Sequence, residues 1–411
     1  MLASCKITPS LKMKILYINS LYSPYIEGGA EISLKLIVEG MKSLGNQVAV
    51  LCLFPGKGME EDEVNGVKVY RAGLQNFYWP YHKKRQGKAL RFAWHLRDRY
   101  NPSMMREVAK VLEKEKPDVV SCHNLAGWSV GVWDEIYNRK IPIVQVLHDM
   151  YLLCANSNMF KGDLPCNNQC LRCRILRYTH KEKSTKVSAV VGISKSILTK
   201  FTDFGYFPNA SKYVIHNTRS IPLPPAKKKR GKGDVLKIGY LGTLSKIKGI
   251  EWLIEQFQSL DINATLVIAG KGKKDYEEKL KSLAHHKNIT FLGYVKSSDF
   301  YPLIDVLVVP SLWEEPLGMV AIEGLANNLP VIANNSGGLK ETVIDGKNGI
   351  LCHASTPDTL GEAIKRLYHG VDFYNELAAL ARPSVSEILS RERMIEQYGS
   401  VMEAIQNTKS S

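Results

Sequence analysis

The chain has 411 residues, of which 45% are hydrophobic and 23% are charged, as in a soluble globular protein with two or three domains. The net charge of +15 predicts an anionic partner, for which nucleic acid, anionic lipid and a nucleotide substrate are candidates. No apolar run is long enough to span a membrane. The eight cysteines do not suggest a secreted disulfide framework, so a reducing compartment is expected.

The N-terminal region reads as the start of a parallel α/β sheet. Residues 1–12 are predicted to be a disordered extension, with Met13 as an alternative start, and no signal-peptide cleavage site follows. The predicted elements are a strand over 13–19, the glycine pair Gly28-Gly29, a helix over 32–44 and a strand over 47–54. This order is a βαβ unit. The glycine pair by itself indicates only a tight turn.

Residues 77–100 combine seven aromatic side chains with seven Lys or Arg and a single acid, Asp98. Such a mixture can stack nucleic-acid bases or lie in a membrane interface. The alternative is an ordinary amphipathic segment with its aromatic side chains in the core. No RNA-binding signature accompanies the segment, so a membrane contact is favoured over nucleic acid.

Two predicted strands, over 117–123 and 141–148, each end in a histidine. His123 is interpreted as a residue that ends a strand. His148 is followed by Asp149, and a single histidine in this position is more often structural than functional.

A cysteine-rich insert follows, with the spacing C-x11-C-x3-C-x2-C. Its thiols are Cys154, Cys166, Cys170 and Cys173. Four thiols in one loop can form a tetrahedral structural zinc site, although this is not a standard ribbon spacing. Free thiols or a disulfide are the alternatives. A second basic patch continues the insert through Arg172, Arg174, Arg177, Lys181 and Lys183.

The proline-rich and charged stretch 222–234 is the best linker candidate in the chain. Its KKKR run is interpreted as a solvated hinge rather than a nucleic-acid patch. The predicted domains are 13–221, with the insert 154–173, and 235–390, followed by a helical segment over 391–411.

Residues 305–351 are the most informative part of the second domain. A buried strand over 305–310 leads to a helix predicted over 317–327, with Pro316 suited to its first position. Glu315 precedes this helix and Glu323 lies about two turns into it, up to roughly 12 Å further along the axis. The free N–H groups between them favour an anion. A nucleotide-diphosphate sugar would need this layout; two solvated helix glutamates are the alternative.

The segments E-P-L-G-M-V-A-I-E-G-L-A, P-V-I-A, S-G-G-L-K-E and D-G-K-N-G-I-L closely resemble the signature of GT4 glycosyltransferases, and the resemblance continues through most of residues 13–400. It implies an α/β chain with the GT-B fold. In that fold two Rossmann-like, doubly wound parallel-sheet domains face each other across a cleft, and the last helix crosses back to the first domain. It also implies that the first domain binds the acceptor and the second the nucleotide sugar.

The resemblance implies roles for individual residues. Catalytic roles fall to Glu315, which holds sugar hydroxyls, to Lys248 at the diphosphate and to His148 at the sugar or acceptor. Donor binding falls to Gly28, Gly29, Gly242, Thr243, Leu317, Gly318, Met319, Val320 and, at the ribose, Glu323. Thr243 stands where the family has arginine, so the diphosphate site lacks one expected cation. The turn Ser336-Gly337-Gly338 is expected to expose backbone N–H groups.

The expected function is retaining transfer of a sugar from a nucleotide-diphosphate sugar to a hydroxyl acceptor. The expected acceptor is a glycan or lipid-linked glycan of cell-surface polysaccharide or lipopolysaccharide synthesis. No cofactor is expected for catalysis. The zinc predicted at the cysteines would be a structural ion. The expected location is the cytoplasm, peripheral to the inner face of the membrane. The alternatives are a binding protein without turnover, favoured by Thr243, and a nucleotide-sugar epimerase.

Overall fold

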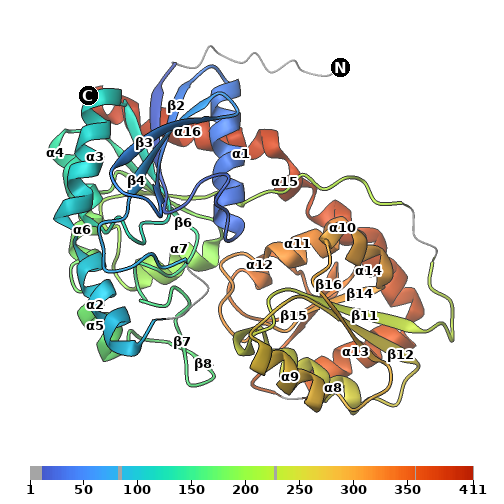
Figure 1. Ribbon diagram of the computed structural model, residues 1–411. Helices are drawn as coiled ribbons and strands as arrows, with labels where there is room; N and C mark the ends of the chain where they lie inside the picture. Colours follow the sequence, from blue (N-terminus) through green and yellow to red (C-terminus); the bar gives the residue numbers. More distant parts are fainter. Residues whose placement is uncertain (1–11, 82–85, 226–228, 357, 411) are drawn as a thin grey trace, which may run out of the picture. The chain divides into compact units, whose positions relative to one another are not determined.

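The computed structural model describes residues 12–81, 86–225, 229–356 and 358–410, which form two compact units (Figure 1). The first unit falls within 1–157, 168–216 and 391–411, and the second within 158–167 and 217–390. Most of the predicted N-terminal extension lies outside the described residues, as do 82–85 of the aromatic segment and 226–228 of the linker. The domain division expected from the sequence placed the whole insert in the first domain, whereas its residues 158–167 group with the second unit.

The first unit is built on an eight-stranded sheet with the order β10-β9-β6-β5-β1-β2-β4-β3. Its strands are β1 (Lys14–Ile18), β2 (Gln47–Phe54), β3 (Met59–Val64), β4 (Val67–Gly73), β5 (Val119–Cys122), β6 (Ile143–Leu147), β9 (Ala189–Gly192) and β10 (Ser211–Val214). Only β3 runs antiparallel to its neighbour. The strand order reverses at β1, which pairs with both β2 and β5, so a ligand site is expected at the carboxyl ends of these strands.

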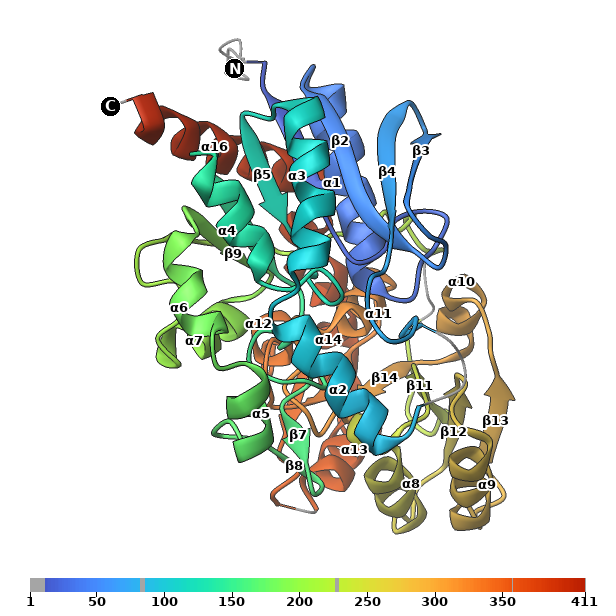
Figure 2. The ribbon, with the colours of Figure 1, turned by 60° about the vertical axis from the view of Figure 1, so that its left-hand side comes forward.

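Helices cover both faces of this sheet (Figure 2). They are α1 (Gly29–Ser43), α2 (Lys88–Arg99), α3 (Pro102–Glu115), α4 (Gly131–Asn138), α5 (Leu171–Leu176), α6 (His180–Lys183), η1 (Ser184–Lys186), α7 (Lys195–Asp203) and α16 (Arg391–Ser410). The C-terminal helix α16 packs on α1, where a Cβ added to Gly40 would lie 2.1 Å from Ile395 Cδ1. A glycine in α1 therefore allows the end of the chain to return to the unit in which the chain begins.

The second unit contains a six-stranded, all-parallel sheet with the order β13-β12-β11-β14-β15-β16. Its strands are β11 (Leu236–Leu241), β12 (Ala264–Ala269), β13 (Ile289–Gly293), β14 (Val306–Val309), β15 (Val331–Asn334) and β16 (Gly349–Cys352), with a separate hairpin of β7 (Phe160–Lys161) and β8 (Leu164–Pro165). The order reverses between β11 and β14, so the loops that follow these two strands border a crevice where ligands of such sheets bind.

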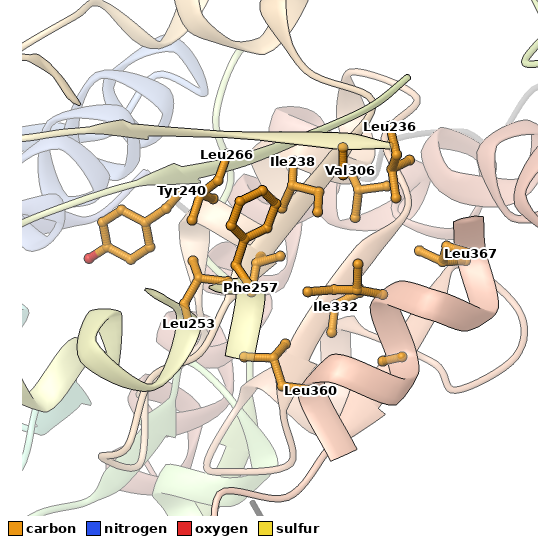
Figure 3. Close-up of a cluster of buried hydrophobic side chains, with 14 of the residues drawn as sticks. Leu236, Ile238, Tyr240, Leu253, Phe257, Leu266, Val306, Ile332, Leu360 and Leu367 are labelled. Carbon is orange, nitrogen blue, oxygen red and sulfur yellow. The ribbon is translucent and has the colours of Figure 1, made fainter. Parts of the chain in front are cut away.

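The helical segments of the second unit are η2 (Lys246–Lys248), α8 (Ile250–Gln258), α9 (Lys274–Leu283), α10 (Ser297–Phe300), η3 (Tyr301–Leu303), α11 (Met319–Ala326), α12 (Leu339–Thr342), α13 (Thr359–His369), α14 (Val371–Ser384) and α15 (Ser386–Leu389). Apolar side chains of β11, α8 and α13 meet on one face of the sheet, as Figure 3 shows for Tyr240, Phe257 and Leu367. The predicted α/β class with two doubly wound parallel sheets is confirmed. No helix in the described part of the chain is long and apolar enough to cross a membrane.

The predicted linker is attached to the second unit through Arg230, which is only 7% exposed. Its guanidinium donates to the carbonyl oxygens of Leu367 at 2.9 Å, Tyr368 at 3.1 Å and Asp234 at 3.0 Å. It also lies over the rings of Tyr368 and Tyr374. The interpretation of this run as a solvated hinge is therefore wrong for Arg230, because its charge is satisfied inside the protein rather than by water.

We expect the Arg230→Ala variant to lose about 2–4 kcal/mol of unfolding free energy, because three carbonyl groups lose a charged donor and two rings lose packing. Chemical denaturation followed by circular dichroism measures this loss. Lys229→Ala is the control, since Lys229 is exposed and its removal should change stability by less than about 0.5 kcal/mol. Equal losses in the two variants would contradict the anchoring role of Arg230.

Candidate active site

The site in the second unit is centred on an ion pair between the loops that follow β11 and β14. Lys248 Nζ lies 2.5 Å from Glu315 Oε1, and the Ser311 hydroxyl donates to the same oxygen at 2.7 Å. Glu315 is 9% exposed. The structure thus brings together two of the three predicted catalytic residues, together with Ser311, which the sequence did not single out.

A glycine makes this approach of the two loops possible. Gly249 follows Lys248 and has a φ of +71°, which L-residues with a side chain rarely adopt. A Cβ at this position would lie 1.9 Å from the carbonyl oxygen of Pro310. The Lys-Gly pair therefore serves two purposes, because the lysine carries the charge and the glycine brings its backbone against the end of β14.

The helix between the two glutamates begins later than predicted. Its first residue is Met319, with Gly318 as N-cap at a φ of +84°, so Pro316 lies outside the helix. A side chain at Gly318 would strain the backbone and would also approach Leu339 Cδ2 to 2.4 Å. Of the predicted donor-binding residues, Met319 and Val320 lie in the first turn, whereas Leu317 and Gly318 precede it.

Glu323 occupies a different environment from Glu315. Its Oε2 accepts a hydrogen bond from the Tyr301 hydroxyl at 3.0 Å. Burial raises the pKa of this carboxyl, an effect that Tyr301 and the positive charge of Arg219 oppose. Glu323 lines a pocket of about 520 Å³ together with Tyr301, Arg219 and the chain that follows Arg219. The two glutamates therefore lie in separate environments, and no local motif in the sequence pointed to Tyr301 or Arg219.

Gly242 and Thr243 follow β11 at the same edge of the sheet. Gly242 has a φ of +154° and packs against Gly270, where an added Cβ would lie 1.8 Å from the Gly242 carbonyl oxygen. Thr243 is exposed, and its carbonyl oxygen accepts a hydrogen bond from the Tyr240 hydroxyl. Thr243, which stands where the family has arginine, thus lies at the edge of the sheet where the strands have their carboxyl ends.

Two of the expected anion-binding amides are already used within the protein. The Gly28 N–H donates to Glu31 Oε2 at 2.9 Å at the start of α1. The Gly338 N–H donates to the Glu315 carbonyl oxygen at 2.6 Å. The expectation of exposed N–H groups in the turn Ser336-Gly337-Gly338 is therefore wrong for Gly338. A phosphate at Gly28 would have to displace the Glu31 carboxylate, whose pKa is raised by burial.

The first unit carries a histidine pair where β5 and β6 end. His123 Nδ1 and His148 Nε2 are 2.8 Å apart, and the rings stack with their centroids 5.1 Å apart. Burial and the neighbouring His148 hold the pKa of His123 well below its usual value, which favours the neutral ring. Ser121 Oγ lies 3.1 Å from His123 Nε2. If this hydroxyl donates, His123 Nδ1–H donates to His148 and fixes its tautomer.

The contact between His123 and His148 was not predicted from the sequence, although a signal for it was present. Two consecutive strands of a parallel sheet both end in histidine, and β5 and β6 are neighbours. Parallel neighbours end at the same edge of a sheet, so the two rings meet there. Next to them, burial raises the pKa of Asp149 to about 6, while its hydrogen bond from the Tyr151 N–H opposes the shift.

Only two of the four cysteines of the insert are buried next to each other. Cys154 and Cys173 are buried, with their sulfur atoms 3.8 Å apart, and Cys166 and Cys170 are half-buried. Among the residues that the structure describes, no three His, Cys, Asp or Glu side chains are arranged as metal ligands. The arrangement of the thiols therefore does not support the zinc site, which stays a prediction.

If the four cysteines hold zinc, the purified protein should contain about one equivalent of metal, and a chelator should lower its melting temperature. Elemental analysis and a thermal melt with and without the chelator measure both effects. Metal-free protein that melts at the same temperature as untreated protein would rule out the zinc site without affecting the glutamate site.

Two family models cover most of the chain. "Glycosyltransferase Family 4" matches residues 27–219, and "Glycosyl transferases group 1" matches residues 225–382. An uncharacterized 42.6 kDa protein of the cps region of Klebsiella pneumoniae is 30% identical, over 80% of this chain and 87% of that relative.

Solved structures share the architecture. Sucrose-phosphate synthase from Thermosynechococcus elongatus has a TM-score of 0.75 at 19% identity, covering 97% of this chain and 100% of that one. Anabaena HepE, solved with UDP and glucose, has a TM-score of 0.69 at 20% identity, covering 95% and 100%. The fold is therefore GT-B, and with the family models and the Klebsiella relative the chain belongs to the GT4-type glycosyltransferases of group 1.

Proposed function

We propose that the protein is a retaining glycosyltransferase that moves a sugar from a nucleotide-diphosphate sugar to a hydroxyl of a glycan or lipid-linked glycan. The observation that carries this proposal is the ion pair between the half-buried Lys248 and the buried Glu315, at the point where the strand order reverses and beside the first turn of α11. HepE has been solved in complex with UDP-glucose, which supports a nucleotide sugar as the donor. The cps-region relative supports a role in cell-surface polysaccharide synthesis.

The chemistry depends on stabilising the leaving group. As the bond to the sugar carbon breaks, negative charge develops on the diphosphate, and a preorganised cation and helix amides lower the energy of that state. An ammonium group has three N–H donors, so Lys248 can hold Glu315 with one and still meet a phosphate oxygen. The Met319 and Val320 amides at the start of α11 supply further donors.

The two glutamates and the histidine position the substrates. Glu315, oriented by Lys248 and Ser311, accepts hydrogen bonds from sugar hydroxyls next to the reacting carbon. Glu323 accepts those of the ribose from its place beside Tyr301. We assign His148 to the sugar or the acceptor. Retention means that the acceptor hydroxyl enters on the face that the diphosphate leaves, with the leaving phosphate as the proton acceptor; the family resemblance implies no metal in this step.

A binding protein without turnover is the second candidate. The exposed Thr243 favours it, since the family arginine would place a further cation at this edge. The intact Lys248–Glu315 pair argues for catalysis.

A thermal-shift screen with UDP, GDP, ADP and dTDP sugars, followed by product analysis, tests the proposal. A true donor at about 100 times its Kd should add about 2.7 kcal/mol of stability. Transfer to an acceptor with retained configuration supports the transferase. Binding without transfer or hydrolysis would favour the binding protein, and interconversion of the sugar would favour an epimerase. No stabilisation by any nucleotide sugar would contradict all three.

The proposed location is the inner face of the cytoplasmic membrane, where lipid-linked acceptors would be available. The described residues of the aromatic segment 77–100 are divided between the core and the surface. Trp94 is buried and donates to the Tyr78 carbonyl oxygen, and Asp98 is buried between the Gly127 N–H and the Tyr151 hydroxyl. Of the aromatic side chains that the structure describes in this segment, only Trp94 is buried, and Phe77 is 57% exposed, so the alternative interpretation applies to Trp94 and not to the segment as a whole.

A further inference from the structure

The helix α5, in the cysteine-rich insert, exposes apolar side chains to an unusual degree. Leu171 is 72% exposed, Ile175 is 43% exposed, and Tyr178, in the turn after the helix, is 77% exposed. Single exposed apolar residues are normal on protein surfaces, but a group of them with a polar border marks a contact surface. We call Leu171, Ile175 and Tyr178 the α5 apolar group.

The opposite side of α5 is firmly attached to the first unit, so the exposure does not reflect a loose segment. Cys173 and Leu176 are buried. Arg177 is buried, donates through Nε to the Tyr151 carbonyl oxygen at 2.8 Å and stacks on the Tyr151 ring at 4.4 Å. These contacts hold the helix in one orientation, with the α5 apolar group facing solvent.

Helix α2 lies beside α5 (Figures 1 and 2). Arg99 donates to the Ile175 carbonyl oxygen at 3.2 Å and joins the two helices. Leu96 of α2 is exposed, whereas Arg97 donates to the Gln75 carbonyl oxygen at 2.9 Å and lies over the Phe77 ring.

Cations border the α5 apolar group. Arg172, Arg174 and Lys181 are exposed, and within the described ranges none of them pairs with a carboxylate. By contrast, Lys183 from the same predicted basic patch turns inward to Asp134 at 2.7 Å, and Arg177 is buried. The patch thus divides into cations that stabilise the fold and cations that face solvent.

We propose that the α5 surface, made of the α5 apolar group with Arg172 and Arg174, docks the protein on an anionic membrane. Leucine, isoleucine and tyrosine enter the boundary between headgroups and acyl chains, while arginines meet the lipid phosphates. A second copy of the chain would place these cations against each other. Nucleic acid would use the cations but offers nothing to the leucine and isoleucine. This inference deepens the peripheral location proposed with the function, and it does not depend on which sugar is transferred.

Vesicle flotation with the full chain tests the surface. Vesicles of phosphatidylglycerol and phosphatidylcholine should carry the protein at low salt, and pure phosphatidylcholine vesicles should not. The variant Leu171→Ser with Tyr178→Ser should lose most of this binding. Tyr137→Ser is the matched control, since Tyr137 is an aromatic residue of the same unit, 53% exposed, and its loss should leave flotation unchanged.

Charge at the surface is tested separately from total charge. Arg172→Gln with Arg174→Gln should lower partitioning roughly 25-fold, at about fivefold for each cation removed from an anionic surface. Lys12→Gln with Lys57→Gln removes the same charge from exposed residues of the first unit and should have a much smaller effect. Equal effects of the two pairs, or no flotation of the unchanged protein at low salt, would overturn the proposal.

The same variants distinguish the membrane from other partners of the α5 surface, and they test the surface separately from the proposed function. If the Leu171→Ser/Tyr178→Ser change abolished a concentration-dependent dimer, seen by sedimentation, or RNA binding, and left flotation intact, the surface would belong to that partner instead. Nucleotide-sugar stabilisation should be the same in all these variants. A donor response without flotation would refute the docking surface alone, and flotation without any donor response would refute the sugar-transfer proposal alone.

Discussion

Replacement of Lys248 by alanine is expected to lower kcat by roughly 10²–10³, the range for loss of a group that stabilises developing charge. The effect should fall on kcat more than on KM, because the diphosphate carries more negative charge in the transition state than in the bound donor. The variant also leaves Glu315, which is 9% exposed, without its cation. A melting curve must therefore accompany the kinetics, and the double variant Lys248→Ala/Glu315→Gln separates a lost cation from an unpaired buried charge.

The glutamates are expected to respond differently from one another. Glu315→Ala should lower kcat and raise KM, because Glu315 both binds and orients the sugar, whereas Glu323→Ala should mainly raise KM for the donor. Glu314 is the control because it is the adjacent acid, whereas Lys248 and Ser311 bind the carboxylate of Glu315. If Glu314→Ala were as damaging as Glu315→Ala in folded protein, the register of the motif would be wrong. Unchanged turnover in all the variants would refute the two-glutamate site.

The sequence predicted the site residues best where a motif is local. Glu315 and Glu323 could be identified from one stretch because seven residues and a helix set their separation. The pairing of Lys248 with Glu315 joins residues 67 positions apart, and no periodicity reports such a contact. It follows from topology instead, since β11 and β14 flank the point where the strand order reverses.

Predictions failed where a backbone conformation or a buried contact decided the outcome. Pro316 suits the first turn of a helix, but Gly318 at positive φ starts the helix later. Arg230 belongs to a run of charges that reads as solvated, yet backbone carbonyls of α13 and two tyrosine rings surround it. The composition shows that such a side chain is charged, but it does not show which groups in the folded protein bind that charge.

The glycine at position 337 is expected to be essential for the placement of Glu315. Gly337 lies in the turn after β15 at a φ of +57°. A Cβ there would lie 2.4 Å from the Glu315 carbonyl oxygen and 2.6 Å from its nitrogen. Both neighbours are backbone atoms that cannot rotate away, and the next residue, Gly338, holds the same carbonyl by a hydrogen bond. The Gly337→Ala variant must therefore move the Glu315 backbone.

Gly346 provides a control that separates steric contact from backbone strain. Its φ of +71° is also positive, but an added Cβ would meet nothing within 4 Å. Gly346→Ala should thus cost only the left-handed strain, about 1–2 kcal/mol, and should keep its turnover. The Gly337→Ala variant should have the same backbone strain and should in addition displace Glu315. A shift of about 1 Å at a positioning residue can lower kcat roughly 10²-fold. Denaturation curves and turnover of the two variants, measured side by side, test this account. Equal losses of activity would mean that strain in the turn, rather than contact with Glu315, is what matters at position 337.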